Sequence, residues 1–161
     1  YYLGLQELVH RNPTADVFMM LQDDLEWPVN WPLKDYLEQT LWPGKEPCVV
    51  SLYCGAEEAT EEHGWTQSPH WKWGALGFLI PRELALKFLA DEQVRDHIHR
   101  TDGSALVGID IQIGDWAKEH DIPVYRPDPS LVQHMGEISS IWPTSRAVGV
   151  RAASRFIVDH I

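Results

Sequence analysis

Residues 17–27 read VFMMLQDDLEW, in which five apolar residues are followed by Gln22 and then by Asp23 and Asp24. The apolar run predicts a buried strand near residues 16–22, and the two carboxylates follow where that strand ends. Neighbouring carboxylates repel each other unless a cation or another partner neutralises them. The stretch therefore predicts a ligand at the end of the strand, and Glu26 adds a third carboxylate close by.

The segments around this strand alternate between helical and extended patterns. The first residues predict a helix with Leu5, Leu8 and Val9 on one face, ended by Asn12 and Pro13. Two further strands are expected at CVVSL and ALGFLI, and further helices are expected to start near Asn30, Pro81 and Gly108. This alternation predicts an α/β layer structure, with a single domain over residues 1–161.

The composition excludes some classes of function. Thirteen basic residues against 24 acidic residues give a net charge of −11, which argues against nucleic acid as a partner and suits a protein that recruits metal cations. No stretch approaches the roughly 18 apolar residues of a membrane span. Cys48 and Cys54 bracket an extended run that places the thiols about 20 Å apart, too far for a disulfide. The composition does not indicate the cellular compartment of the protein.

Asp23 and Asp24 have two interpretations. They can be turn and helix-capping carboxylates, or they can be hard oxygen ligands for Mg²⁺ or Mn²⁺, ions that often also bind substrate phosphates. His134, in the segment PSLVQHMG, is by itself a core or surface histidine. If it joins the carboxylates, the expected metal shifts towards manganese, because imidazole favours transition ions.

Asp110 precedes the pattern of a helix in VGIDIQIGDW. One interpretation is an N-terminal helix cap, favoured by the helix dipole. The other is a general base at the edge of a cleft, for which geometry must decide whether it reaches a substrate hydroxyl. Asp115 is a nearby rival, but its position within the helix predicts a solvated side chain.

Aromatic side chains crowd into the long segment 55–74, which has no clear periodicity and is expected to be a binding loop or lid. Trp65, Trp71 and Trp73 lie there and can stack on carbohydrate rings if they are exposed. Alternatively, the segment folds down and buries them. The glutamates of the same segment are expected to form a solvated face.

Taken together and in this order, these motifs resemble the nucleotide-sugar-dependent glycosyltransferases of the GT-A fold. The likeness covers residues 17–140 and is closest to N-acetylglucosaminyltransferase IV and related enzymes, with QDD at the strand end, an aromatic loop before GALGF, the acid of GID and the segment PSLVQHMGEISS. Two features depart from that pattern. Gln22 replaces an acidic residue, and only the last helix of the βαβ region that precedes the QDD strand is expected here.

The resemblance implies a mostly parallel sheet flanked by helices, with an incomplete N-terminal nucleotide-binding part and a site at the carboxyl ends of the strands. Asp24 would bind Mn²⁺ or Mg²⁺, and His134 would be a second ligand or a neighbour of the diphosphate. Asp23, with Gln22 beside it, would contact the ribose of the nucleotide or a metal-bound water.

The same resemblance implies the reaction and its remaining residues. Asp110 would be the base that activates an acceptor hydroxyl, and the loop with the tryptophans and Gly74 would cover donor and acceptor. The expected activity is transfer of a sugar from a nucleotide-sugar donor, most simply a UDP-sugar, to a carbohydrate or glycoconjugate acceptor with inversion. Two other classes stay open: a noncatalytic carbohydrate-binding module that uses the tryptophans, and a metal-dependent phosphohydrolase.

Overall fold

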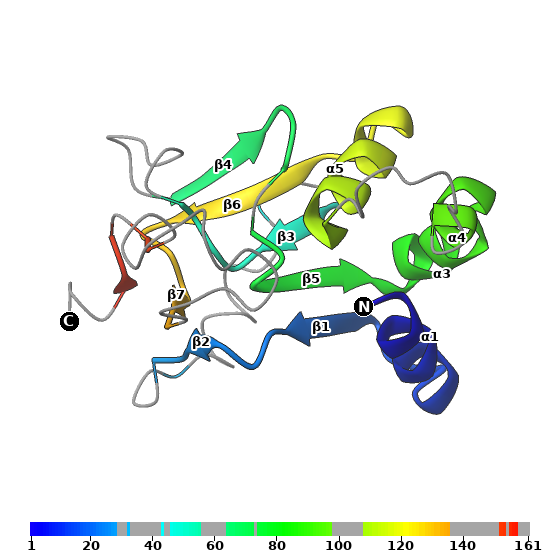
Figure 1. Cartoon of the computed structure of the whole chain (residues 1–161), viewed down its shortest axis with the longest axis horizontal. Helices are drawn as coiled ribbons and strands as arrows, with labels where there is room; N and C mark the ends of the chain where they lie inside the picture. Colours follow the sequence, from blue (N-terminus) through cyan, green and yellow to red (C-terminus); the bar gives the residue numbers. More distant parts are fainter. Residues whose placement is uncertain are drawn as a thin grey trace.

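A five-stranded sheet forms the centre of the computed structural model, with the strand order β1-β5-β3-β6-β4 (Figure 1). The structure describes residues 1–28, 32, 43, 46–55, 64–72, 74–97, 108–135, 152–153 and 155–157. The strands of this sheet are β1 (Val17–Leu21), β3 (Val49–Ser51), β4 (Gly64–Ser68), β5 (Gly77–Pro81) and β6 (Val124–Asp128). A separate two-stranded ladder joins β2 (Leu25–Glu26) to β7 (Gln133–His134).

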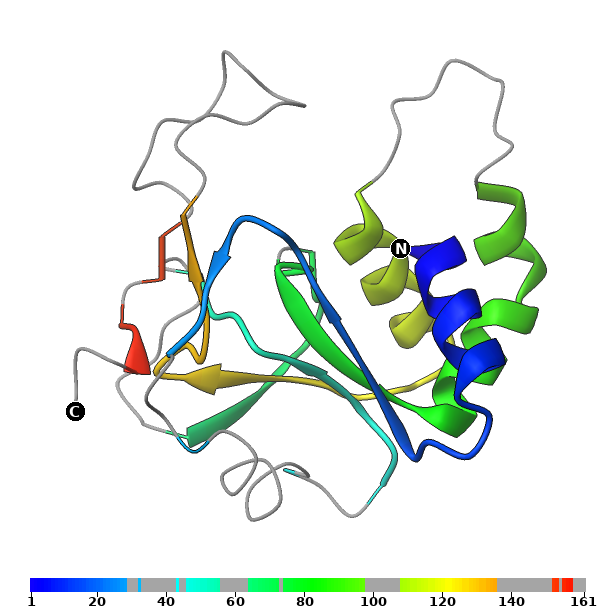
Figure 2. The same ribbon diagram turned by 90° about the horizontal axis from the view of Figure 1, so that it is seen from below.

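The helices lie together on one side of the sheet, as both ribbon views show (Figures 1 and 2). They are α1 (Tyr2–Arg11), α3 (Arg82–Ala90), α4 (Glu92–His97) and α5 (Ile109–Glu119). The helices expected at the N-terminus, after Pro81 and after Gly108 are confirmed, whereas the one expected after Asn30 lies outside the described residues. Among the helices that the structure describes, none is long and apolar enough to cross a membrane.

The sheet is mixed in direction. Strands β3 and β6 pair in parallel, whereas β5 runs antiparallel to both β1 and β3, and β4 runs antiparallel to β6. The α/β architecture is thus as expected, but parallel pairing does not dominate. Strands such as VVS and GFLIP are buried on both faces, a property that usually accompanies parallel sheets and that here arises because both faces of a mixed sheet are covered.

Two hydrophobic clusters account for this burial, one on each face of the sheet. Alternate strand residues enter opposite clusters, so that Val49 and Phe78 face the helices while Val50 and Leu79 face the other way. The helix-side cluster includes Leu5, Leu84, Phe88 and Trp116. The opposite cluster includes Leu131 and Val132, with Ala153 and Ile157 packed against it.

The segment expected to be an irregular loop is partly ordered into the core. Strand β4 lies within it, and Trp71 is only 1% exposed in the helix-side cluster. Helix α5 approaches Trp71 so closely that a Cβ added to Gly114 would lie 1.7 Å from the Trp71 carbonyl oxygen. Trp71 is therefore not the exposed stacking platform that was considered for it, because its ring is used for packing.

The carboxyl ends of β1, β3 and β6 meet at one edge of the sheet, beside the β2–β7 ladder (Figure 1). The chain leaves these ends through residues 22–24, 52–55 and 129–132. Cys48 and Cys54, which flank β3, are both buried and free of disulfides, as expected. Asp24 and His134 lie at this edge.

Candidate functional site

The QDD turn is held in place by backbone contacts to two other segments. The Gln22 N–H donates to the Leu76 carbonyl at 2.8 Å, and the Asp24 carbonyl accepts from the Met135 N–H at 2.8 Å. Strand β2 then pairs with β7, so that Leu25 lies opposite His134. This register places His134 beside Asp24, although the two residues are far apart in the sequence.

As a result, the Asp24 and His134 side chains lie in direct contact. His134 Nε2 is 3.1 Å from Asp24 Oδ2, and the His134 side chain is only 9% exposed. The other carboxylate oxygen, Asp24 Oδ1, is buried and has no hydrogen-bond partner within the described part of the chain. A buried acceptor without a partner is unfavourable, so Oδ1 is a candidate position for a ligand.

The separation of the pair also suits a shared cation. Two adjacent ligands of an octahedral ion, each about 2.1 Å from it, lie about 3 Å apart. A direct N–H···O bond has a similar length, so the distance fits a hydrogen bond and a shared cation equally well. The described residues hold no group of three or more His, Cys, Asp or Glu side chains that could bind a metal. Further ligands would therefore be water or substrate oxygens, the usual arrangement for Mg²⁺.

Asp110 lies in the first turn of α5, after the helix cap Gly108. Its Oδ1 accepts from the Ile111 N–H at 3.0 Å. Burial raises the pKa of the carboxyl group, although backbone hydrogen bonds from Ile111, Asp110 itself and Gly74 oppose the rise. Asp110 is thus a half-buried carboxylate of raised basicity and not the N-cap residue of the helix.

Three consecutive residues, Gly74, Ala75 and Leu76, connect Asp110 to the QDD turn. The Gly74 backbone hydrogen-bonds to the Asp110 carboxylate, and the Leu76 carbonyl accepts from Gln22. Between them, the Ala75 carbonyl accepts from the Tyr1 hydroxyl at 2.8 Å. The GAL segment therefore brings into one region residues that are far apart in the sequence.

Gly74 cannot be replaced easily by a residue with a side chain. Its φ is +127°, a conformation that L-residues rarely adopt. A Cβ at this position would lie 2.8 Å from Trp71 Nε1 and 3.1 Å from Ser51 Oγ. The glycine expected to cover the substrates thus has a demonstrable structural role in the segment beside Asp110.

Tyr1 is the site residue that the sequence did not reveal. Its pKa is raised to about 12: burial is the largest cause, the Gln22 side chain opposes it through a hydrogen bond, and the charges of Asp24, Asp110 and Asp23 add to it. One hydroxyl therefore senses all three aspartates of the candidate site. No pattern marked this residue, because it precedes an ordinary amphipathic helix.

Of the other residues expected from the sequence, the structure describes Asp23, Trp65 and Asp115. Asp23 is exposed, and Trp65 is half-buried on β4, where it packs against the cluster opposite the helices. Asp115 is exposed, as expected, and its Oδ1 lies 2.9 Å from His70 Nε2. Trp73, Ser139 and Ser140 lie outside the described residues.

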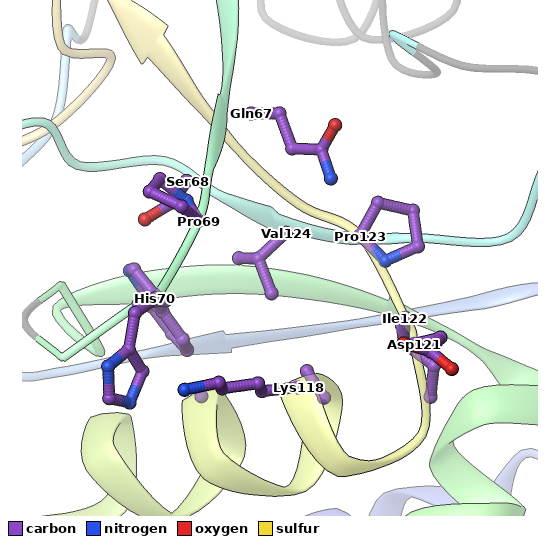
Figure 3. Close-up of a pocket in the computed structure, with 12 residues that line it drawn as sticks. Gln67, Ser68, Pro69, His70, Lys118, Asp121, Ile122, Pro123 and Val124 are labelled. Atoms are coloured by element: carbon purple, nitrogen blue, oxygen red, sulfur yellow. The ribbon is translucent and has the colours of Figure 1, made fainter.

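A cavity of about 200 Å³ lies between the end of β4 and α5 (Figure 3). Its walls include Gln67, Ser68, His70, Lys118 and Val124, the first residue of β6. This places the cavity at the opposite edge of the sheet from the QDD turn. The cavity therefore belongs to the packing of α5 against β4 and β6 and is separate from the candidate site.

No protein-family model matches this chain, and no curated protein matches it. Any function assigned to the chain therefore depends on the chemistry of the site itself.

Proposed function

We propose that this chain is a GT-A-type glycosyltransferase domain that uses Mn²⁺ or Mg²⁺ to transfer a sugar from a nucleotide-sugar donor, most simply a UDP-sugar, to a carbohydrate hydroxyl with inversion. The observation that supports the proposal is that Asp24 contacts His134 and that the charges of Asp24, Asp110 and Asp23 all act on the Tyr1 hydroxyl. Asp24, His134 and Asp110 are the metal ligands and the base that the resemblance implies. Open α/β sheets commonly bind ligands at the carboxyl ends of their strands.

Asp24 and His134 would hold the divalent cation. The bound cation would stabilise the negative charge that develops on the departing nucleoside diphosphate. Asp24 contributes the unpartnered Oδ1, and the nearly buried His134 side chain contributes a nitrogen that favours Mn²⁺ over Mg²⁺. The exposed Asp23 is free to contact the ribose of the donor.

Asp110 would accept the proton from the acceptor hydroxyl as this hydroxyl attacks the anomeric carbon. Burial raises the pKa of Asp110, which makes its carboxylate a better proton acceptor than a solvated aspartate. A positioned base of this kind typically contributes a factor of about 10²–10⁴ in rate. The hydrogen bond from Gly74 keeps the carboxylate oriented relative to the segment that contacts the QDD turn.

Calorimetric titration of UDP tests the nucleotide site. With Mn²⁺ present, the protein is expected to release heat on UDP binding, and EDTA is expected to abolish it. Asp24→Asn should abolish the same heat, because the substitution removes a charged metal ligand. Asp115→Asn is the matched control, since Asp115 is an exposed aspartate paired with His70, and it should bind UDP as the wild type does.

This titration, glycan binding and phosphate release together separate the other two classes of function. UDP binding that is unchanged by EDTA and by Asp24→Asn would contradict the proposed site. A carbohydrate-binding module would bind glycans regardless of chelator and nucleotide. A phosphohydrolase would release phosphate from UDP or a simple phosphate ester in the presence of the metal.

A further inference from the structure

We propose that Tyr1 is a positioning residue of the candidate site, which holds the GAL segment at residues 74–76 between the QDD turn and Asp110, with Gln22 as the partner of its phenol oxygen. The effect on turnover that we expect from removal of the Tyr1 hydroxyl rests on the proposed function. The effect on the Asp110 carboxylate is structural and can be measured even if the protein shows no transferase activity.

The phenol of Tyr1 is held at both ends. Its ring stacks on Phe78 of β5, with the ring centroids 6.0 Å apart and an interplanar angle of 27°. Its hydroxyl donates to the Ala75 carbonyl at 2.8 Å. The side chain thus links the start of α1 to the sheet and to the GAL segment, while Tyr1 remains 37% exposed.

The contact at Ala75 is central to the geometry of the site. Ala75 is 3% exposed, and its two neighbours hold the Asp110 carboxylate and the Gln22 backbone. Loss of the Tyr1 hydroxyl leaves the buried Ala75 carbonyl without the hydrogen bond that holds it, so the segment is free to shift. A shift at Ala75 moves the Gly74 N–H away from Asp110.

The same contacts favour a glutamine at position 22, whose side chain hydrogen-bonds to the Tyr1 phenol. The phenol has a single hydrogen, which it donates to Ala75, so the group that approaches its oxygen must be a donor. An amide NH₂ meets this requirement and an ionised carboxylate does not. A glutamate at this position would also add a fourth negative charge near Asp23, Asp24 and Asp110, whereas Gln22 keeps the pair with Tyr1 uncharged.

The test is Tyr1→Phe, which removes only the hydroxyl, compared with Tyr2→Phe. The two variants are matched because the Tyr2 hydroxyl donates to the Leu89 carbonyl, also at 2.8 Å, on the helical side of the molecule. The Asp110 carboxyl is titrated by ¹³C NMR in the wild type and in both variants. Tyr1→Phe should raise the pKa of Asp110 further, because the Gly74 hydrogen bond that lowers it is weakened, and Tyr2→Phe should leave it unchanged.

Turnover with a UDP-sugar and Mn²⁺ is measured on the same proteins. Tyr1→Phe is expected to lower kcat by roughly tenfold with little change in KM for the donor, as misplacement of a base does. An Asp110 titration identical in Tyr1→Phe and the wild type overturns the positioning role, whether or not the chain transfers sugar. If the wild type has no transferase activity but Tyr1→Phe still shifts Asp110, the proposed function fails and the positioning role stands.

Discussion

Two of the histidine–aspartate pairs, of nearly equal length, lie in different regions of the molecule. On the helical side, His120 Nε2 is 3.0 Å from Asp91 Oδ2, and at the carboxyl edge of the sheet His134 Nε2 is 3.1 Å from Asp24 Oδ2. Their surroundings differ. The Asp91 Oδ1 accepts from the backbone N–H groups of Gln93 and Val94 and so caps α4, whereas the Asp24 Oδ1 is buried with no hydrogen-bond partner in the described chain.

This comparison shows how a structural carboxylate differs from a candidate ligand. Burial tends to raise the pKa of Asp91, but the hydrogen bonds from His120, Val94 and Gln93 outweigh it and lower the pKa. Asp110 also accepts three hydrogen bonds, all from backbone groups, but at this residue burial outweighs them and raises the pKa. The distance within a His–Asp pair therefore says little by itself, and the two pairs differ in what the second oxygen of each carboxylate contacts.

Of the substitutions considered, Trp71→Ala should produce the largest change in free energy. This change is a loss of stability. Trp71 is almost completely buried in the helix-side cluster, and truncation of such an aromatic side chain typically lowers the free energy of unfolding by about 3–5 kcal/mol. Chemical denaturation measures this loss. Trp65→Ala is the control and should cost less, because Trp65 is only half-buried. A small loss for Trp71→Ala would contradict its place in the core.

Asp110→Asn should produce the largest effect at the sheet edge. We expect turnover to fall by more than about a hundredfold, which corresponds to about 2.7 kcal/mol in the activation barrier, while metal-dependent UDP binding is retained. Steady-state kinetics and UDP titration on the same protein measure the two quantities. Near-normal turnover would remove Asp110 from the role of base.

His134→Ala and His120→Ala compare the two pairs directly. His134→Ala should weaken Mn²⁺ binding by roughly tenfold, or about 1.4 kcal/mol, because it removes a proposed ligand. His120→Ala should leave Mn²⁺ binding unchanged and lower the melting temperature, since it removes a hydrogen bond to the capping Asp91. Equal Mn²⁺ affinity in the two variants, measured by calorimetry, would remove the distinction between the pairs.

The smallest effect is a difference in pH dependence. Because the pKa of Asp110 is raised in the folded state, its contribution lowers the free energy of unfolding as pH rises from the ordinary aspartate value through the raised pKa. Asp91 has the opposite sign: its lowered pKa stabilises the protein above the ordinary value, and this stability is lost as pH falls through the lowered pKa. Chemical denaturation at several acidic pH values measures the free energy of unfolding as a function of pH. Asp110→Asn should make this dependence flatter above the ordinary aspartate pKa, and Asp91→Asn should make it flatter below that pKa.

Local patterns predicted much of the architecture. The helix over Tyr2–Arg11, the strand Val17–Leu21 before the aspartates and the helices Arg82–Ala90 and Ile109–Glu119 follow from apolar periodicity and from residues that start or end helices. Strand β4 was missed because GWTQS has neither an apolar run nor a clear alternation, and it is ordered by pairing with β6. The relative direction of the strands also could not be predicted from the sequence. Strands that are buried on both faces occur in this mixed sheet as they do in parallel sheets.

The sequence by itself determined most of the short segments that form helices and strands, because each must bury one face and satisfy its own backbone. It also indicated Asp24, His134 and Asp110 as candidates, through their motifs. Only the tertiary structure decided that Asp24 contacts His134, that Trp71 is buried, and that the Tyr1 hydroxyl reaches Ala75, which lies 74 residues away. These contacts depend on strand order and register, and such long-range pairing has no signature in the local pattern of either partner.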